Sequence, residues 1–146
     1  NIVLWDGACH VHEQFSVEGI LALKKEHPEA KVVVHPECKE AVADTADYIG
    51  STAGILEYCG ASEATEFIVV TEAGILAEMA RKIPNKRFIP APTTDSSCTC
   101  NECKYMKMVT LESIIACLES ESPEITMDEA TRSSAERSIL NMISIK

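Results

Sequence analysis

The chain has 146 residues, of which 46% are hydrophobic and 25% are charged, and its formal net charge is −10. This length suits one ordinary domain or a fragment of a larger protein, and the apolar content is too high for a disordered chain. The acidic balance argues against nucleic acid and anionic membrane as partners, because both need clustered Lys and Arg. The acidic balance does not argue against a small anionic ligand, since such a ligand requires only a local positive field.

The sequence predicts a cytoplasmic protein. No apolar run approaches the roughly 20 residues that span a bilayer, and no basic-then-apolar signal segment is visible. The seven Cys are odd in number, unevenly spread and mixed with His, which favours metal ligands or reactive thiols over a disulfide framework. The chain starts on a predicted strand without an initiator Met, which suggests a further segment upstream.

Strand and helix patterns alternate through the first half. Residues 1–5 read as a buried strand, and a helix with Ser16 as its N-cap extends to a stop at Pro28. The run "AKVVVHPEC" contains a short β-branched strand of the kind buried in parallel sheets. A second helix is expected through Ala41, Val42, Ala46 and Ile49 as far as Gly50, and a third is capped by the Ser-Thr pair at 51–52.

The same order returns further along the chain. "EFIVVTEAG" predicts a strand and turn, "ILAEMARKIPN" a helix and "KRFIPAP" another strand. Strands that alternate with helices indicate an α/β fold with a parallel sheet and crossover helices.

The composition changes near the carboxyl end. Residues 92–103 are polar and rich in Cys, which predicts a loop and a domain boundary. "TLESIIACLE" resumes a helix with Thr110 as its cap. A terminal helix is expected to start near residues 127–128 and to bury four apolar side chains, Ala135, Ile139, Met142 and Ile143.

Polar residues follow several predicted strands, where open α/β folds place their functional groups. Cys9 and His12 follow the first strand, and His35 and Glu37 follow the β-branched run. In extended chain, His35 and Glu37 point to the same side, so they could share a proton or bind one substrate. The alternative is a strand-end His bonded to a neighbouring Glu without any catalytic role.

Two other groups could bind ligands. Ser51 and Thr52 open a helix, where free N–H groups suit a phosphate or carboxylate, although ordinary capping explains them equally. The thiols of Cys98, Cys100 and Cys103 favour metal or redox chemistry, but no second pair at zinc-knuckle spacing is present. The remaining thiols, Cys38, Cys59 and Cys117, are interpreted as ordinary buried groups.

The motifs "WDGACHVHEQF", "VVVHPEC", "GSTAGI", "TEAGI", "APT" and "CNECKYMKMVTLESI" resemble, in this order, those of the quinolinate synthase family. The resemblance covers residues 4–118 and implies the carboxyl-terminal portion of an enzyme with three Rossmann-like, three-layer α/β domains around a pseudo-threefold axis. Residues 1–12 would then end the second domain and 13–97 form the third. Residues 98–146 would form a cysteine loop and helices that pack back on the first domain.

The resemblance also implies chemistry. The family condenses iminoaspartate with dihydroxyacetone phosphate to quinolinate, releasing phosphate and water, in NAD biosynthesis, and is linked functionally to L-aspartate oxidase or aspartate dehydrogenase. Its [4Fe–4S] cluster has three Cys ligands, of which Cys9 and Cys103 match two, and the third is expected upstream. The open iron would act as a Lewis acid.

Site roles follow by the same resemblance. Glu37 matches the proton-transfer residue and His35 its substrate-binding companion, while His12 lines the site. Ser51 and Thr52 match a helix N-terminus that binds an anionic group of the substrate.

Two alternatives of other classes remain. The first is a non-catalytic zinc-binding or redox-sensing module that uses "CTCNEC", and the second is a nucleotide-binding regulator, although GxGxxG and P-loop signatures are absent. The spacing of Cys100 and Cys103 also leaves open a disulfide that withdraws a cluster ligand, and the roles of Cys98 and Glu72 are unassigned.

Overall fold

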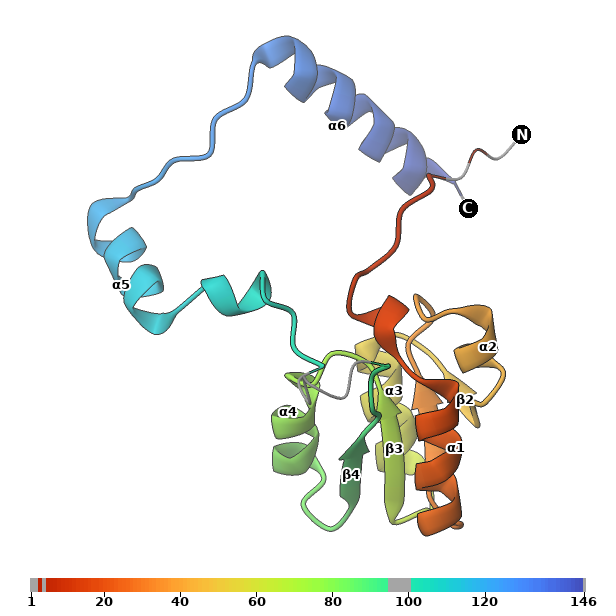
Figure 1. Cartoon of the computed structure of the whole chain (residues 1–146). Coiled ribbons are helices and arrows are strands. Elements are labelled where there is room, and N and C mark those ends of the chain that lie inside the picture. The colour runs from red at the N-terminus through yellow and green to blue at the C-terminus, as the bar shows by residue number, and fades with distance from the viewer. Residues whose placement is uncertain (1–2, 4, 95–100, 146) are drawn as a thin grey trace. The chain divides into compact units, whose positions relative to one another are not determined.

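The computed structural model describes residues 3, 5–94 and 101–145 of the chain (Figure 1). The chain divides into two compact units, Asn1–Lys107 and Met108–Lys146. None of the helices in the described part combines the length and apolarity needed to cross a bilayer. The domain boundaries expected after residues 12 and 97 stay predictions.

The first unit is built on a four-stranded parallel sheet in the order β2-β1-β3-β4. Its strands are β1 (Lys31–Val34), β2 (Tyr48–Ile49), β3 (Glu66–Val70) and β4 (Arg87–Pro90). Because all four run in the same direction, their carboxyl ends lie at one edge of the sheet. The predicted parallel α/β fold is confirmed.

Helices cover both faces of this sheet, which explains why its strands are apolar without alternation. On one face, Val32 and Val34 pack with Ile20 of α1 (Val17–Glu26) and with α2 (Glu40–Ala43). On the other face, Val33 and Phe67 pack with α3 (Thr52–Ala61) and α4 (Ile75–Lys82). Figure 1 shows α1 and α3 on opposite sides of the strands.

The strand expected at the amino terminus is wrong for the residues that are described. Val3 and Trp5 lie outside any strand, with 93% and 90% of their surfaces exposed, and the remaining positions of that run lie outside the described residues. A strand forms only where a neighbour supplies hydrogen-bond partners. Within the described residues, no strand pairs with this segment.

The long helix expected up to Gly50 is also wrong, because α2 is a single turn and the chain then enters β2. Asp47 causes this change: its N–H donates to the carbonyl of Val32 at 2.8 Å, and its carboxylate accepts from the N–H of Val32 at 2.8 Å and from Lys31 Nζ at 2.9 Å. The N–H of Gly50 donates to the carbonyl of Val34 and extends the pairing. Tertiary pairing with β1 overrides the local helical pattern.

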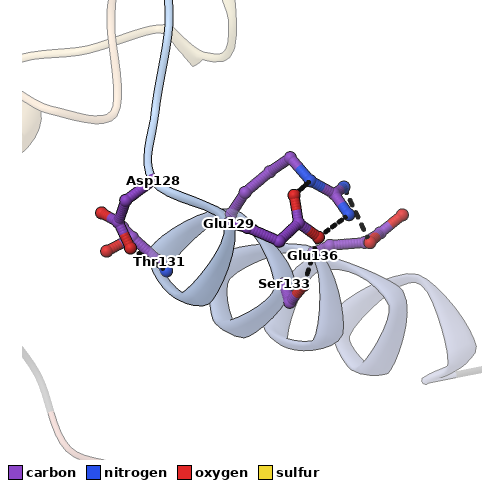
Figure 2. Close-up of polar contacts among 6 residues, drawn as sticks. Asp128, Glu129, Thr131, Ser133 and Glu136 are labelled. Carbon is purple, nitrogen blue, oxygen red and sulfur yellow. Dashed lines mark hydrogen bonds and ion pairs between the residues drawn. The ribbon is translucent and has the colours of Figure 1, made fainter.

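Helical structure returns after the loop, as η2 (Met106–Met108), α5 (Leu111–Ser120) and α6 (Glu129–Ser144). Both predicted helix starts are confirmed. The N–H of Ser113 donates to Thr110 Oγ1 at 3.1 Å and the N–H of Thr110 donates to Ser113 Oγ at 3.0 Å, which forms a capping box on α5. Asp128 caps α6 by accepting from the N–H of Thr131 (Figure 2).

The polar side chains near the start of α6 pair with one another. Arg132 donates to the carboxylates of both Glu129 and Glu136, and Ser133 Oγ donates to Glu129. Figure 2 shows Glu129, Ser133 and Glu136 on this helix. Such exposed pairs contribute little to stability individually.

The expected burial of apolar side chains on α6 is wrong in this structure. Ile139, Met142 and Ile143 keep 53%, 63% and 69% of their surfaces exposed, and Ala135 is exposed too. A helix buries a stripe only against a second layer of structure. Apart from the last residue of η2, the described residues of Met108–Lys146 hold only α5 and α6 as helices and no strand, so this unit has little with which to cover them.

Candidate functional site

A cleft of about 630 Å³ lies at the carboxyl edge of the sheet. Its wall combines residues from the ends of β1 and β3, from η1 (His12–Gln14), from the first turns of α3 and α4, and from the segment after residue 100. The predicted site residues on this wall are Cys9, His12, His35, Glu37, Thr52 and Cys103. Strand-end residues meet here because the strands are parallel, as the sequence predicted.

His12 is the most constrained of these side chains and is 94% buried, with 6% of its surface exposed. Its Nδ1 lies 3.0 Å from Glu37 Oε2, and its Nε2 lies 3.1 Å from Thr71 Oγ1. A carboxylate only accepts, so the hydrogen of neutral His12 is assigned to Nδ1, and the Thr71 hydroxyl donates to Nε2. This arrangement fixes both the tautomer and the ring plane of His12.

The electrostatic surroundings keep His12 neutral. Burial lowers the pKa of His12 below its ordinary value and the neighbouring His35 lowers it further, while the Glu37 carboxylate acts in the opposite direction. The Nδ1 hydrogen of the neutral ring therefore lies between His12 and the Glu37 carboxylate. The pair can therefore hold one proton between them.

His35 stacks on His12, with ring centroids 4.4 Å apart and an interplanar angle of 8°. The expected extended geometry of His35 and Glu37 is wrong, because residues 36–37 form a turn that the Cys38 N–H closes onto the His35 carbonyl. His35 Nδ1 accepts weakly from the Glu37 N–H at 3.4 Å, and it lies 3.9 Å from the carboxylate. Glu37 thus bonds His12 rather than its neighbour in sequence.

A group of metal-ligating atoms surrounds this pair. Cys9 Sγ, a ring nitrogen of His12 and a carboxylate oxygen of Glu37 all lie within 4.8 Å of one another. Cys103 lines the same cleft, and both thiols are free. Cys98 and Cys100, which belong to the predicted cysteine motif, lie outside the described residues.

The predicted anion site at α3 divides into two roles. Ser51 Oγ accepts from the N–H of Gly54 at 3.2 Å, so this side chain is the N-cap of the helix. Thr52 lies on the cleft wall, next to the positive end of the helix dipole. Before α4, Glu72 lies two residues ahead of the N-cap residue Gly74, and its carboxylate accepts from the N–H of Gly74 at 2.7 Å.

Thr71, Glu72 and Asn101 are the residues that sequence reasoning left without a specific role. Thr71 is buried against His12, and its position directly after β3 was the only signal for it. Glu72 accepts from the N–H of Cys103, and Asn101 is buried with 3% of its surface exposed. Neither the bond of Glu72 to Cys103 nor the burial of Asn101 has a signature in the local sequence.

The cleft wall is acidic. Among its described lining residues are Glu37, Glu72 and Glu78 but neither Lys nor Arg. Glu78 is paired with Arg81 and Lys82, at 2.8 and 3.1 Å. An anionic ligand would therefore need positive charge from the α3 terminus, from a bound metal, or from groups outside these residues.

Comparison with known proteins identifies the relatives of this chain. The family model described as "Quinolinate synthetase A protein" matches residues 1–144. The chain belongs to the quinolinate synthase family. It is 46% identical over 145 residues to a quinolinate synthase of Chloroherpeton thalassium and 47% identical over 145 residues to one of Synechococcus, and both alignments cover 99% of the chain.

These relatives are much longer than the chain. The same alignments cover 45% of each relative, as does the alignment to the quinolinate synthase of Synechocystis, which is 46% identical. The chain therefore spans less than half the length of the family members it matches.

Three other cysteines of this family member are not among the residues that line the cleft. Cys38 and Cys59 are buried, as expected, and burial raises their pKa values to about 11 and about 12, so both stay protonated. The expectation that Cys117 is buried is wrong, since it is exposed on α5. It lies in the unit whose apolar side chains lack a covering layer within the described residues.

Proposed function

We propose that this chain is part of a quinolinate synthase that condenses iminoaspartate with dihydroxyacetone phosphate to quinolinate, releasing phosphate and water, in NAD biosynthesis. Family membership supports the proposal. The observation that carries it is the convergence of Cys9, Cys103, His12, His35 and Glu37, from separate parts of the sequence, on one cleft. The reaction class needs such a combination of metal ligands and proton carriers.

The donor set fits an iron–sulfur cluster. Cys9 and Cys103 are free thiols on one wall, and thiolates are the ligands that hold such clusters. We infer that these two residues hold a [4Fe–4S] cluster together with a third Cys from outside the chain. When bound with three Cys ligands, the cluster would supply an open iron as a Lewis acid that can coordinate an oxygen atom of the substrate.

Glu37 is the proposed proton-transfer residue. One carboxylate oxygen accepts from His12 Nδ1, and the other is available to a substrate, since 57% of the side chain is exposed. Condensation and dehydration require protons to leave carbon and reach a departing oxygen, and a carboxylate within hydrogen-bond reach of the substrate can serve both needs. Neutral His12 donates its Nδ1 hydrogen to the carboxylate and fixes it in place, while the Thr71 hydroxyl donates to Nε2 on the far side of the ring.

His35 and α3 are proposed to bind the substrate. His35 Nδ1 faces the Glu37 N–H, so Nε2 carries the hydrogen of the neutral ring and can donate to a substrate oxygen. Thr52 and the free N–H groups of the α3 terminus suit a carboxylate or phosphate group. Ser51 contributes mainly by ending the helix correctly.

The remaining expectations are proposals about the complete protein. We propose that residues 1–12 end a preceding domain, that 13–97 form the third domain and that 98–146 pack back on the first. The exposed apolar side chains of α5 and α6 support this arrangement, because Leu111, Leu118 and Ile143 would then gain a covering surface. Iminoaspartate would come from an aspartate-oxidising enzyme such as L-aspartate oxidase or aspartate dehydrogenase.

A zinc site is the second candidate, since the ligand atoms of Cys9, His12 and Glu37 lie close enough to share one ion. Metal analysis of anaerobically purified full-length protein separates the two functions. Iron with acid-labile sulfide, together with quinolinate formed from the two substrates, supports the synthase. One zinc per chain, no sulfide and no quinolinate would favour the binding module.

A further inference from the structure

The segment that carries Cys103 is attached to the carboxyl edge of the sheet at two strand ends. The carbonyl of Asn101 accepts from the N–H of Ala73 at 2.9 Å, in the turn after β3. The side-chain amide of Asn101 donates to the carbonyl of Ala91, directly after β4. Since Asn101 is buried, the backbone is fixed two residues before Cys103.

Glu72 makes the next connection. One carboxylate oxygen, Oε1, accepts from the N–H of Cys103 at 3.1 Å, and the other, Oε2, accepts from the N–H of Gly74 at 2.7 Å. Hydrogen bonds from backbone N–H groups to a carboxylate are stronger than those between neutral groups. A single side chain thereby joins the start of α4 to a residue 31 positions further along the chain.

Gly74 leaves the space that this carboxylate occupies. A Cβ atom at residue 74 would lie 2.6 Å from Glu72 Oε2, which is closer than van der Waals contact allows. The backbone itself does not require glycine, because its φ of −58° suits any residue. The glycine is therefore needed for the position of Glu72.

We propose that Glu72 is a positioning residue for Cys103. Its two hydrogen bonds hold the peptide of this cysteine against the first turn of α4, so that the thiol stays on the cleft wall it shares with Cys9 before any metal binds. The identity of the metal group rests on the function proposed above. Loss of a partner that orients a metal ligand typically lowers metal affinity about 10- to 100-fold.

Glu72 could instead serve only to cap α4 through Gly74. Glu72→Asp separates the two roles, because aspartate still reaches the N–H two residues on but is one methylene too short to bond Cys103 as well. Glu72→Gln keeps the length but has a single oxygen, so one N–H loses its acceptor. Gly74→Ala displaces the carboxylate, and Glu57→Gln, an exposed position on α3, is the matched control.

The test uses the full-length protein that contains this chain. Cluster loss to an iron chelator is timed after anaerobic reconstitution with ferrous iron and sulfide. The rate at which iodoacetamide alkylates each cysteine is measured in the apoprotein by mass spectrometry. We expect Glu72→Asp, Glu72→Gln and Gly74→Ala to lose the cluster about 10- to 100-fold faster than the parent, and to alkylate faster at Cys103 but not at Cys9. Glu57→Gln should match the parent.

A Glu72→Asp protein that equals the parent in both measurements would overturn the positioning role and leave only the cap. If the parent binds zinc without sulfide, the proposed function fails instead. The alkylation rates then still decide the role of Glu72, since they need no cluster.

Discussion

The Nδ1 atom of His12 lies 3.0 Å from the Glu37 carboxylate, although 25 positions separate the two residues. Thr71 Oγ1 bonds the opposite nitrogen of the same ring. This relationship links the ends of two strands and orients the exposed carboxylate of Glu37 toward the cleft that Cys9 lines. It makes a neutral, buried imidazole the support of the proposed proton carrier.

Stability should fall in mild acid because of His12. Burial, aided by His35, lowers its pKa in the folded state below the ordinary 6.5, so the unfolded chain binds the proton more readily. The contribution of His12 to the free energy of unfolding is therefore complete above pH 6.5 and is lost as the pH falls below that value. Urea unfolding between pH 7.5 and about 5 checks this in the parent and in His12→Gln. The free energy of unfolding should fall more steeply with decreasing pH in the parent than in His12→Gln, and this difference is the contribution of His12. The same pH dependence in both proteins would contradict the assignment.

Ser51 and Thr52 should respond differently to alanine. Ser51→Ala removes the N-cap of α3 and should cost about 1 kcal/mol of stability, with kinetics little changed. Thr52→Ala removes a hydroxyl from the cleft wall and should raise KM or lower kcat while the melting temperature stays close to the parent's. If Thr52→Ala shows normal kinetics and a lowered melting temperature, both residues only cap the helix and neither binds substrate.

Cys9→Ala should abolish cluster assembly in the full-length protein, because its thiol is one of the two proposed ligands in this chain. Cys117→Ala is the control, since that thiol is exposed on α5 and is not among the residues that line the cleft. Iron and acid-labile sulfide per chain are the measurements. A Cys9→Ala protein with a full complement of both would exclude Cys9 as a ligand.

Asp47→Ala should detach β2 from β1. The substitution leaves the N–H of Val32 and the amine of Lys31 without their acceptor. The bond from the Val32 N–H to the charged carboxylate contributes about 1.5–3 kcal/mol, whereas the exposed Lys31 pair adds little. Hydrogen exchange should accelerate at Gly50, whose N–H pairs with β1, and stay slow in β3. Unchanged protection at Gly50 would show that β2 is held by other contacts.

The features that sequence predicted correctly depend on residues close together in the chain. Ser16 and Asp128 bond N–H groups three residues ahead, and the β-branched run through Val32 and Val33 suits a strand buried on both faces. The residues that determine these features lie within a few positions of one another in the sequence. Parallel pairing then brings the strand ends to one edge, which is why most of the predicted residues line one cleft.

The features that sequence missed depend on contacts between distant segments. The strand β2 exists because Asp47 pairs with Val32, and nothing in residues 40–50 indicates that partner. The turn after His35 directs Glu37 to His12, whereas the spacing alone suggested a pair with His35. The bond between Glu72 and Cys103 likewise follows from the tertiary fold.

The proposed proton transfer by Glu37 is the central claim, and Glu37→Gln tests it most directly. The change preserves shape and removes the titrating group, so the cluster should assemble and substrates should still bind. Glu40→Gln, an exposed position on α2, is the matched control.

The measurement is quinolinate formed per intact cluster, under anaerobic conditions, in the full-length protein. We expect the Gln variant to be slower by about 10²- to 10⁴-fold, the usual contribution of a positioned acid–base group, with Glu40→Gln equal to the parent. Turnover of Glu37→Gln at the parent's rate would show that Glu37 only orients His12 and that the base lies elsewhere.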